Sequence, residues 1–156
     1  MLFNARPKIT MFEDRGDLQM NDNRWPRAFF ASAAFYAMIG VGWGLAMGAT
    51  KNHATYSAHA HLNLLGWLSQ AMMGTFYATV GQAVSNKVKA ANFVLLNLGV
   101  LLMIPGVGLY LGQAAPPAVF GPMIAAGSLL VAAGFLVFGV TAILGAFRGS
   151  TSAASA

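Results

Sequence analysis

Charged residues are absent from three long stretches of this chain, and these gaps limit the folds that it can adopt. No Asp, Glu, Lys or Arg lies between Arg27 and Lys51, between Lys51 and Lys87, or between Lys89 and Arg148. The whole chain is 57% hydrophobic and 8% charged, which is too apolar for an ordinary soluble domain. Because a helix needs about 20 apolar residues to cross the hydrocarbon core of a bilayer, the sequence predicts an all-α membrane protein.

The lengths of the gaps predict four transmembrane helices, because the last gap is long enough for two. Pro116 and Pro117 separate these two helices, since a pair of prolines cannot continue a helix. The expected spans cover residues 28–48, 58–81, 90–112 and 120–146. The predicted units of the chain are an N-terminal segment 1–27, a four-helix transmembrane domain 28–148 and a small, polar tail 149–156 that is expected to be disordered.

The basic residues flank the predicted spans and indicate the orientation of the chain. With the N-terminus in the cytoplasm, eight basic residues lie inside and only Lys51 lies outside, which agrees with the positive-inside rule. The eight are Arg6, Lys8, Arg15, Arg24, Arg27, Lys87, Lys89 and Arg148. We therefore expect a multi-pass protein of the bacterial cytoplasmic (inner) membrane with both termini cytoplasmic. The basic residues that give the chain its net charge of +5 are expected to set its topology among membrane lipids. They are not expected to bind nucleic acid.

Small residues in the first predicted span favour close contact with another helix. Gly40, Gly44 and Gly48 occur at every fourth position and so form one stripe. Such a stripe more often packs against a helix of the same chain than against another subunit.

Two histidines near the start of the second predicted span are candidate cofactor ligands. On a helix, His59 and His61 point about 200° apart and so face different neighbours. Ionisable groups at membrane depth are interpreted as functional by default, and neutral imidazole is a good ligand for haem iron. Asn63 and Trp67 follow on the same span and are expected to shape the pocket. The alternative is a pair of packed histidines, satisfied by Asn, Ser or backbone groups of adjacent helices.

The chain contains no cysteine, which excludes disulfides, thiolate metal sites and covalent attachment of haem. A copper or zinc site made from His53, His59 and His61 is disfavoured, because the three residues are spread around the helix and no acidic residue assists them. Any haem is therefore expected to be held non-covalently.

A longer pattern surrounds the two histidines. Residues His59, His61, Leu65, Gly66, Trp67, Gly74 and Tyr77 fit H-x-H-x-x-x-L-G-W followed by G-x-x-Y. This segment, 59–77, resembles the tenth helix of the large subunit of the haem-copper oxidase superfamily, in cbb-type oxidases and their nitric oxide reductase relatives. In that family the first histidine ligates the high-spin haem and the second ligates the low-spin haem. The resemblance implies that His59 and His61 are axial ligands of a b-type haem.

The family's large subunit contains three groups of four helices with pseudo-threefold symmetry, and its ligand helices are second in their groups. One chain of this protein therefore resembles one third of that subunit, which implies a homotrimer. Each haem would then lie between His59 of one protomer and His61 of the next, with a dimer sharing one haem as the alternative. The chain departs from the family in lacking the copper-binding histidines and the histidine-tyrosine pair, so a complete haem-copper centre is not expected.

Three functions stay open at this stage. A bis-histidine haem b protein would transfer electrons, with a donor and an acceptor that the sequence does not identify, or would sense redox state or small gases. A haem with an open axial position would make the protein an enzyme of nitric oxide or oxygen chemistry. A chain that keeps the helix pattern for packing alone would be a cofactor-free accessory protein of a respiratory complex.

Overall fold

The computed structural model describes residues 24–153, and side chains within residues 24–145. In chain order, this part comprises α2 (Arg24–Thr50), α3 (Tyr56–His61), the π-helical segment η1 (Leu62–Leu68), α4 (Ser69–Ala78), α5 (Asn86–Leu111) and α6 (Pro117–Ala153). Helices are the only regular elements within the described range, which confirms the predicted all-α class.

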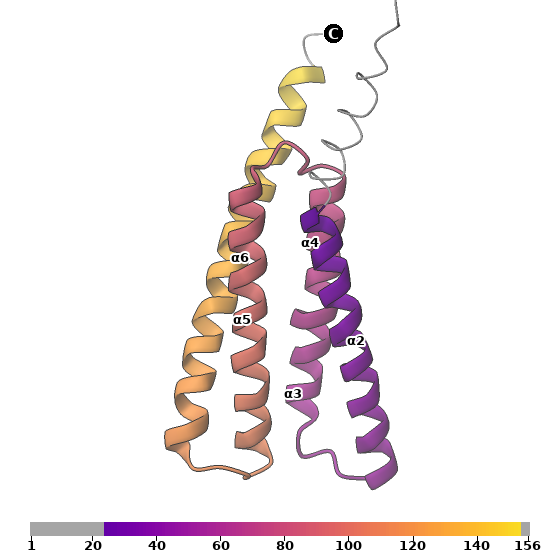
Figure 1. The fold of residues 1–156 in the computed structure, drawn as a ribbon, viewed down its shortest axis with the longest axis vertical. Coiled ribbons are helices and arrows are strands. Elements are labelled where there is room, and N and C mark those ends of the chain that lie inside the picture. Colours follow the sequence, from indigo (N-terminus) through magenta and orange to yellow (C-terminus); the bar gives the residue numbers. More distant parts are fainter. Residues whose placement is uncertain (1–23, 154–156) are drawn as a thin grey trace, which may run out of the picture.

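The helices form two antiparallel hairpins that lie side by side (Figure 1). In the first, α2 packs against the consecutive elements α3, η1 and α4, and in the second α5 packs against α6. The loops 51–55 and 112–116 lie at one end of the bundle, and the connection 79–85 lies at the other. Lys51 and Lys87 therefore lie at opposite ends.

Three of the helices are long and apolar enough to cross a membrane. They are Arg24–Thr50, Asn86–Leu111 and Pro117–Gly145, with mean hydropathies of 1.5, 2.1 and 2.3. Their outer surfaces carry large apolar side chains such as Leu45 and Leu129, which are 71% and 72% exposed. A multi-pass membrane protein is the class that fits this surface. The second predicted span is not one long α-helix, because its residues are divided among α3, η1 and α4.

The two ends of the chain differ in how far the structure reaches. Most of the predicted N-terminal segment, residues 1–23, lies outside the described residues, as do residues 154–156. At the other end, α6 continues to Ala153 and so extends past 148, where the sequence predicts the start of a disordered tail.

Aromatic rings and close glycine contacts hold the bundle together. The buried ring of Phe29 on α2 lies 5.5 Å from the ring of Tyr77 on α4 and 5.2 Å from the ring of Phe93 on α5. Between α5 and α6, a Cβ added at Gly127 would lie only 2.5 Å from the backbone nitrogen of Met103. The second hairpin therefore depends on a glycine at a contact between two backbones.

Candidate functional site

The two candidate histidines lie on different faces of their helix, as their spacing predicts. His59 is partly buried and faces α2, where a Cβ added at Gly44 would lie 3.1 Å from its ring carbon Cε1. His61 is exposed on the outside of the bundle. Two imidazoles that face different neighbours do not bind one ion within a single chain, so each would need a partner on its own side.

A hydrogen bond to a backbone carbonyl selects the tautomer of neutral His61. Its Nδ1 lies 2.7 Å from the carbonyl oxygen of Ser57 and 3.4 Å from the hydroxyl oxygen of the same residue. Because a carbonyl oxygen only accepts, Nδ1 carries the ring proton, and Nε2 of the neutral imidazole keeps its lone pair. Metal-ligating histidines commonly donate their other ring N–H to a carbonyl in this way. His61 thus has the tautomer of an Nε2 ligand on an exposed face.

His59 has a different environment, because Asn63 covers its ring. The amide nitrogen Nδ2 of Asn63 lies 3.1 Å from Nε2 and 3.4 Å from Nδ1 of His59, and it donates to the His59 carbonyl oxygen at 3.1 Å. On the α2 side, a Cβ added at Gly40 would overlap with Oδ1 of Asn63. Ligation through Nε2 of His59 would therefore require Asn63 to turn away.

The predicted glycine stripe of α2 packs within the chain over part of its length. Gly40 and Gly44 make room for Asn63 and His59, whereas a Cβ at Gly48 would meet nothing within 4 Å. The interpretation as an intramolecular contact is thus confirmed for the first two glycines.

The helix widens directly after His61. The backbone N–H of Ser69 donates to the carbonyl oxygen of Leu64, five residues earlier, and the Ser69 hydroxyl donates to the same oxygen at 2.7 Å. Such π-helical turns occur frequently at functional sites.

The wide turn also affects how this helix packs against its neighbours. Buried positions recur at every fourth residue, at Ala58, Leu62, Gly66, Gln70 and Gly74. In a regular α-helix this spacing drifts by about 40° per step, and a wider turn reduces the drift.

Three residues of the family-like pattern pack inside the fold. A Cβ added at Gly66 would lie 2.8 Å from Cγ of Tyr36, and one added at Gly74 would lie 3.3 Å from the carbonyl oxygen of Pro26. Tyr77 is buried in the core. Trp67, by contrast, is 48% exposed. A role for Trp67 beside a cofactor therefore requires that the cofactor lie outside the single chain.

A polar network that sequence reasoning missed crosses the bundle. Gln70 is fully buried, its Nε2 donates to Oδ1 of Asn97 at 3.2 Å, and its Oε1 accepts from Nδ2 of Asn97 at 3.2 Å. Ser32 donates to the same Gln70 oxygen, and the hydroxyl of Tyr36 donates to Asn97 Oδ1 at 3.1 Å. The network joins α2, α4 and α5. The signal for it was the presence of uncharged polar residues inside otherwise apolar spans.

The third histidine does not join the other two. His53 is exposed in the loop before α3. Within residues 24–153, no three His, Cys, Asp or Glu residues come together as a metal-binding group.

Comparisons of the chain with models of protein families, with curated proteins and with solved structures find no match. The resemblance to the oxidase helix therefore depends on the pattern in residues 59–77 alone.

Proposed function

We propose that this chain is a four-span protein of the bacterial cytoplasmic membrane that binds b-type haem non-covalently between copies of itself. His59 and His61 are the axial ligands, and the protein transfers electrons or senses redox state or small gases. The observation that carries the proposal is the tautomer of His61, whose Nδ1 is held by the Ser57 carbonyl while Nε2 is left for a ligand on an exposed face.

The second span of the proposal is the continuous segment 56–78, formed by α3, η1 and α4. A helical segment of this length is about 35 Å long, which is enough to cross a hydrocarbon core of about 30 Å. With the single lysine of the 51–55 loop outside, the basic residues Arg24, Arg27 and Lys87 lie at the cytoplasmic end. This orientation puts both histidines near the outer surface.

The assembly follows from the two directions in which the histidines point. His61 is exposed, whereas His59 lies partly buried against Gly44 of its own chain, so a haem held by both is shared between protomers. Closed cyclic symmetry repeats such a contact between unlike surfaces. A homotrimer is the proposed assembly, and a dimer is the alternative. An iron with two imidazole ligands is suited to the exchange of single electrons.

The test is the absorption spectrum of the purified, haem-supplied protein, oxidised and reduced, with a pyridine haemochrome assay for haem per chain. We expect the sharp reduced bands of six-coordinate haem b, lost in His61→Ala and lost or shifted in His59→Ala. His53→Ala is the matched control, because the exposed side chain of His53 lies in the loop before α3 and not on the helix that carries His59 and His61, and its spectrum should equal that of the parent. Parent-like spectra for all three variants would contradict the ligand assignment.

An open axial position is a second candidate, and the contact between Asn63 and His59 favours it. If Asn63 stays within 3.1 Å of His59 Nε2, only His61 ligates, and the other side of the iron is available for nitric oxide or oxygen. Binding of carbon monoxide to the reduced protein distinguishes this enzyme-like candidate from the bis-histidine form.

A cofactor-free accessory protein is the third candidate. The packing of Gly66, Gly74 and Tyr77 inside the fold favours it, because these contacts explain the family-like pattern without any haem. A protein that stays colourless after haem supply would favour this candidate over the other two.

A further inference from the structure

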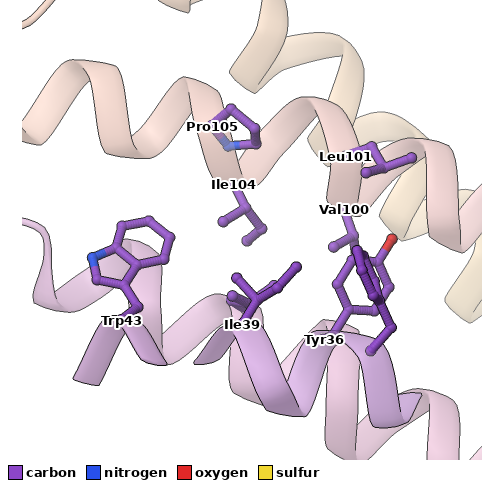
Figure 2. A pocket seen from close by; sticks show the side chains of 9 residues that line it. Tyr36, Ile39, Trp43, Val100, Leu101, Ile104 and Pro105 are labelled. Atoms are coloured by element: carbon purple, nitrogen blue, oxygen red, sulfur yellow. The ribbon is translucent and has the colours of Figure 1, made fainter. Parts of the chain in front are cut away.

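Two cavities meet at the indole ring of Trp43. The larger one is a groove of about 410 Å³ between α2 and α5, and its walls include Tyr36, Ile39, Leu101 and Ile104. Figure 2 shows these side chains converging from the two helices, with Trp43 at one end of the groove and Tyr36 at the other. The lining is entirely apolar, since the Tyr36 hydroxyl is engaged by Asn97.

The smaller cavity lies beyond the indole, at the end of α2, and has a volume of about 270 Å³. Its polar lining comes from Thr50, Asn52 and Thr55, and no charged side chain is part of it. Asn52 accepts the backbone N–H of Ala54 through Oδ1 at 3.0 Å, which leaves its amide nitrogen as a donor. The site therefore offers a hydrogen bond to an uncharged acceptor near the membrane surface.

Trp43 is held in place between the two cavities. Its Nε1 donates to the hydroxyl oxygen of Thr55 at 3.0 Å, and its ring lies over Gly108 of α5, where an added Cβ would come within 3.6 Å of Cη2. A flat aromatic surface thus separates the apolar groove from the polar end.

The groove is open to the outside of the bundle along its length. Three of its lining side chains are large, apolar and exposed: Phe35 at 53%, Ile39 at 42% and Leu101 at 54%. A membrane-dissolved molecule can enter sideways from the bilayer. The groove volume lies within the usual range for small-molecule sites, about 300–1,000 Å³.

We propose that this composite site binds a lipid-soluble quinone, with the isoprenoid tail in the groove and the ring beside Trp43. A quinone fits each part: its tail is apolar, its ring is flat and stacks on an indole, and its carbonyl oxygens are uncharged acceptors for Asn52. A phospholipid is the competing occupant: its charged phosphate finds no cation in the lining of the smaller cavity, and exposed Lys51, between the lining residues Thr50 and Asn52, is not part of that lining.

The location links the site to the candidate histidines. Trp43 precedes Gly44, the residue against which the ring of His59 packs. A quinone bound here would be the electron partner of the proposed haem protein, and in that role it rests on the proposed function. Quinone binding itself does not require haem.

The test is photolabelling of the full-length protein in phospholipid nanodiscs with an azido-ubiquinone, followed by peptide mapping. We expect label on α2 and α5 around Trp43 and Leu101, displaced by excess decylubiquinone but not by decylbenzene, which has the tail without the quinone ring. Leu101→Trp and, from the opposite wall, Ile39→Trp fill the groove. Because each indole occupies groove space that the tail would otherwise fill, each variant should lose most of the displaceable label at a limiting probe concentration.

Leu98→Trp is the matched control, because Leu98 is exposed on the same helix but does not line the groove. Its labelling should equal that of the parent. Equal labelling of Leu98→Trp and both groove variants would overturn the proposal, as would displacement by decylbenzene. A phospholipid retained in native mass spectrometry and lost in Leu101→Trp, with no displaceable quinone label, would assign the groove to a lipid instead. Because labelling is measured with or without bound haem, it separates failure of this site from failure of the haem proposal.

Discussion

Replacing Gly66 with alanine tests whether η1 is locked against α2. The added Cβ would lie 2.8 Å from Cγ and 3.0 Å from Cβ of Tyr36. Carbon atoms in contact prefer about 3.5–4.0 Å, so the two helices must separate by roughly 0.5–1 Å. Rotation of the Tyr36 ring gives no relief, because Cβ moves only with the α2 backbone and the hydroxyl is bound to Asn97 at 3.1 Å.

The size of the effect follows from two opposing contributions. Overpacking a close contact costs about 1–3 kcal/mol, and alanine in place of glycine returns at most about 1 kcal/mol through helix propensity. We expect Gly66→Ala to lower the free energy of unfolding by about 1–2 kcal/mol. In a chain of 156 residues this lowers Tm by about 2–8 °C. Gly42→Ala, with nothing within 4 Å of the added Cβ, is the control and should raise Tm slightly.

The measurement is thermal unfolding of the purified protein in detergent, followed by far-ultraviolet circular dichroism. All variants are heated at one scan rate, because irreversible unfolding makes Tm depend on that rate. A Tm for Gly66→Ala equal to or above that of Gly42→Ala would refute the close contact between Gly66 and Tyr36. It would also remove Gly66 from the packing argument for the accessory-protein candidate, which would then depend on Gly74 and Tyr77.

Three further predictions concern the network, the second hairpin and the topology. Gln70→Leu removes a fully buried member of the network and should cost about 1 kcal/mol of stability, read as a lower Tm, since hydrogen bonds between membrane helices contribute about that much. Gly127→Ala should lower Tm because the added Cβ meets the α5 backbone, whereas Gly139→Ala, with nothing within 4 Å, should not. Because the chain lacks cysteine, Lys51→Cys and Lys87→Cys are unique thiols, and an impermeant maleimide should label only the first from outside intact cells; labelling of both or of only the second would reject the orientation.

The helices could be predicted because their determinants are local. The expected first span 28–48 lies inside α2, and the third, 90–112, ends within one residue of the end of α5. Because a charged side chain is costly in hydrocarbon, long stretches without charge are enough to locate such segments. The proline pair at 116 and 117 marks the turn before α6 for an equally local reason, the missing N–H.

The site could be predicted only in part, because packing decides the rest. A spacing of two residues predicts that His59 and His61 diverge, but not which of them faces α2. That choice depends on Gly40 and Gly44, which leave space for Asn63 and His59 on one side only. The wide turn at η1 was not predictable from hydrophobic periodicity, because a regular period of 3.6 residues is the assumption behind such an analysis. The groove at Trp43 was likewise not predictable, because its walls come from α2 and α5, which are distant in sequence.

The two histidines have unequal surroundings within the single chain, since His59 is partly buried and His61 is exposed. Inside the chain, Asn63 offers a polar partner to His59, while the Nε2 lone pair of His61 faces outward because Nδ1 already donates to Ser57. A surface that covered His61 without offering a donor or a metal would leave a buried acceptor unpaired, at a cost of about 1–3 kcal/mol. An interface that forms on this face must therefore bring a partner for Nε2. A haem iron meets that requirement, and so does a hydrogen-bond donor from a second copy. The visible spectra of the parent and of His61→Ala decide between the two partners, since only haem absorbs visible light.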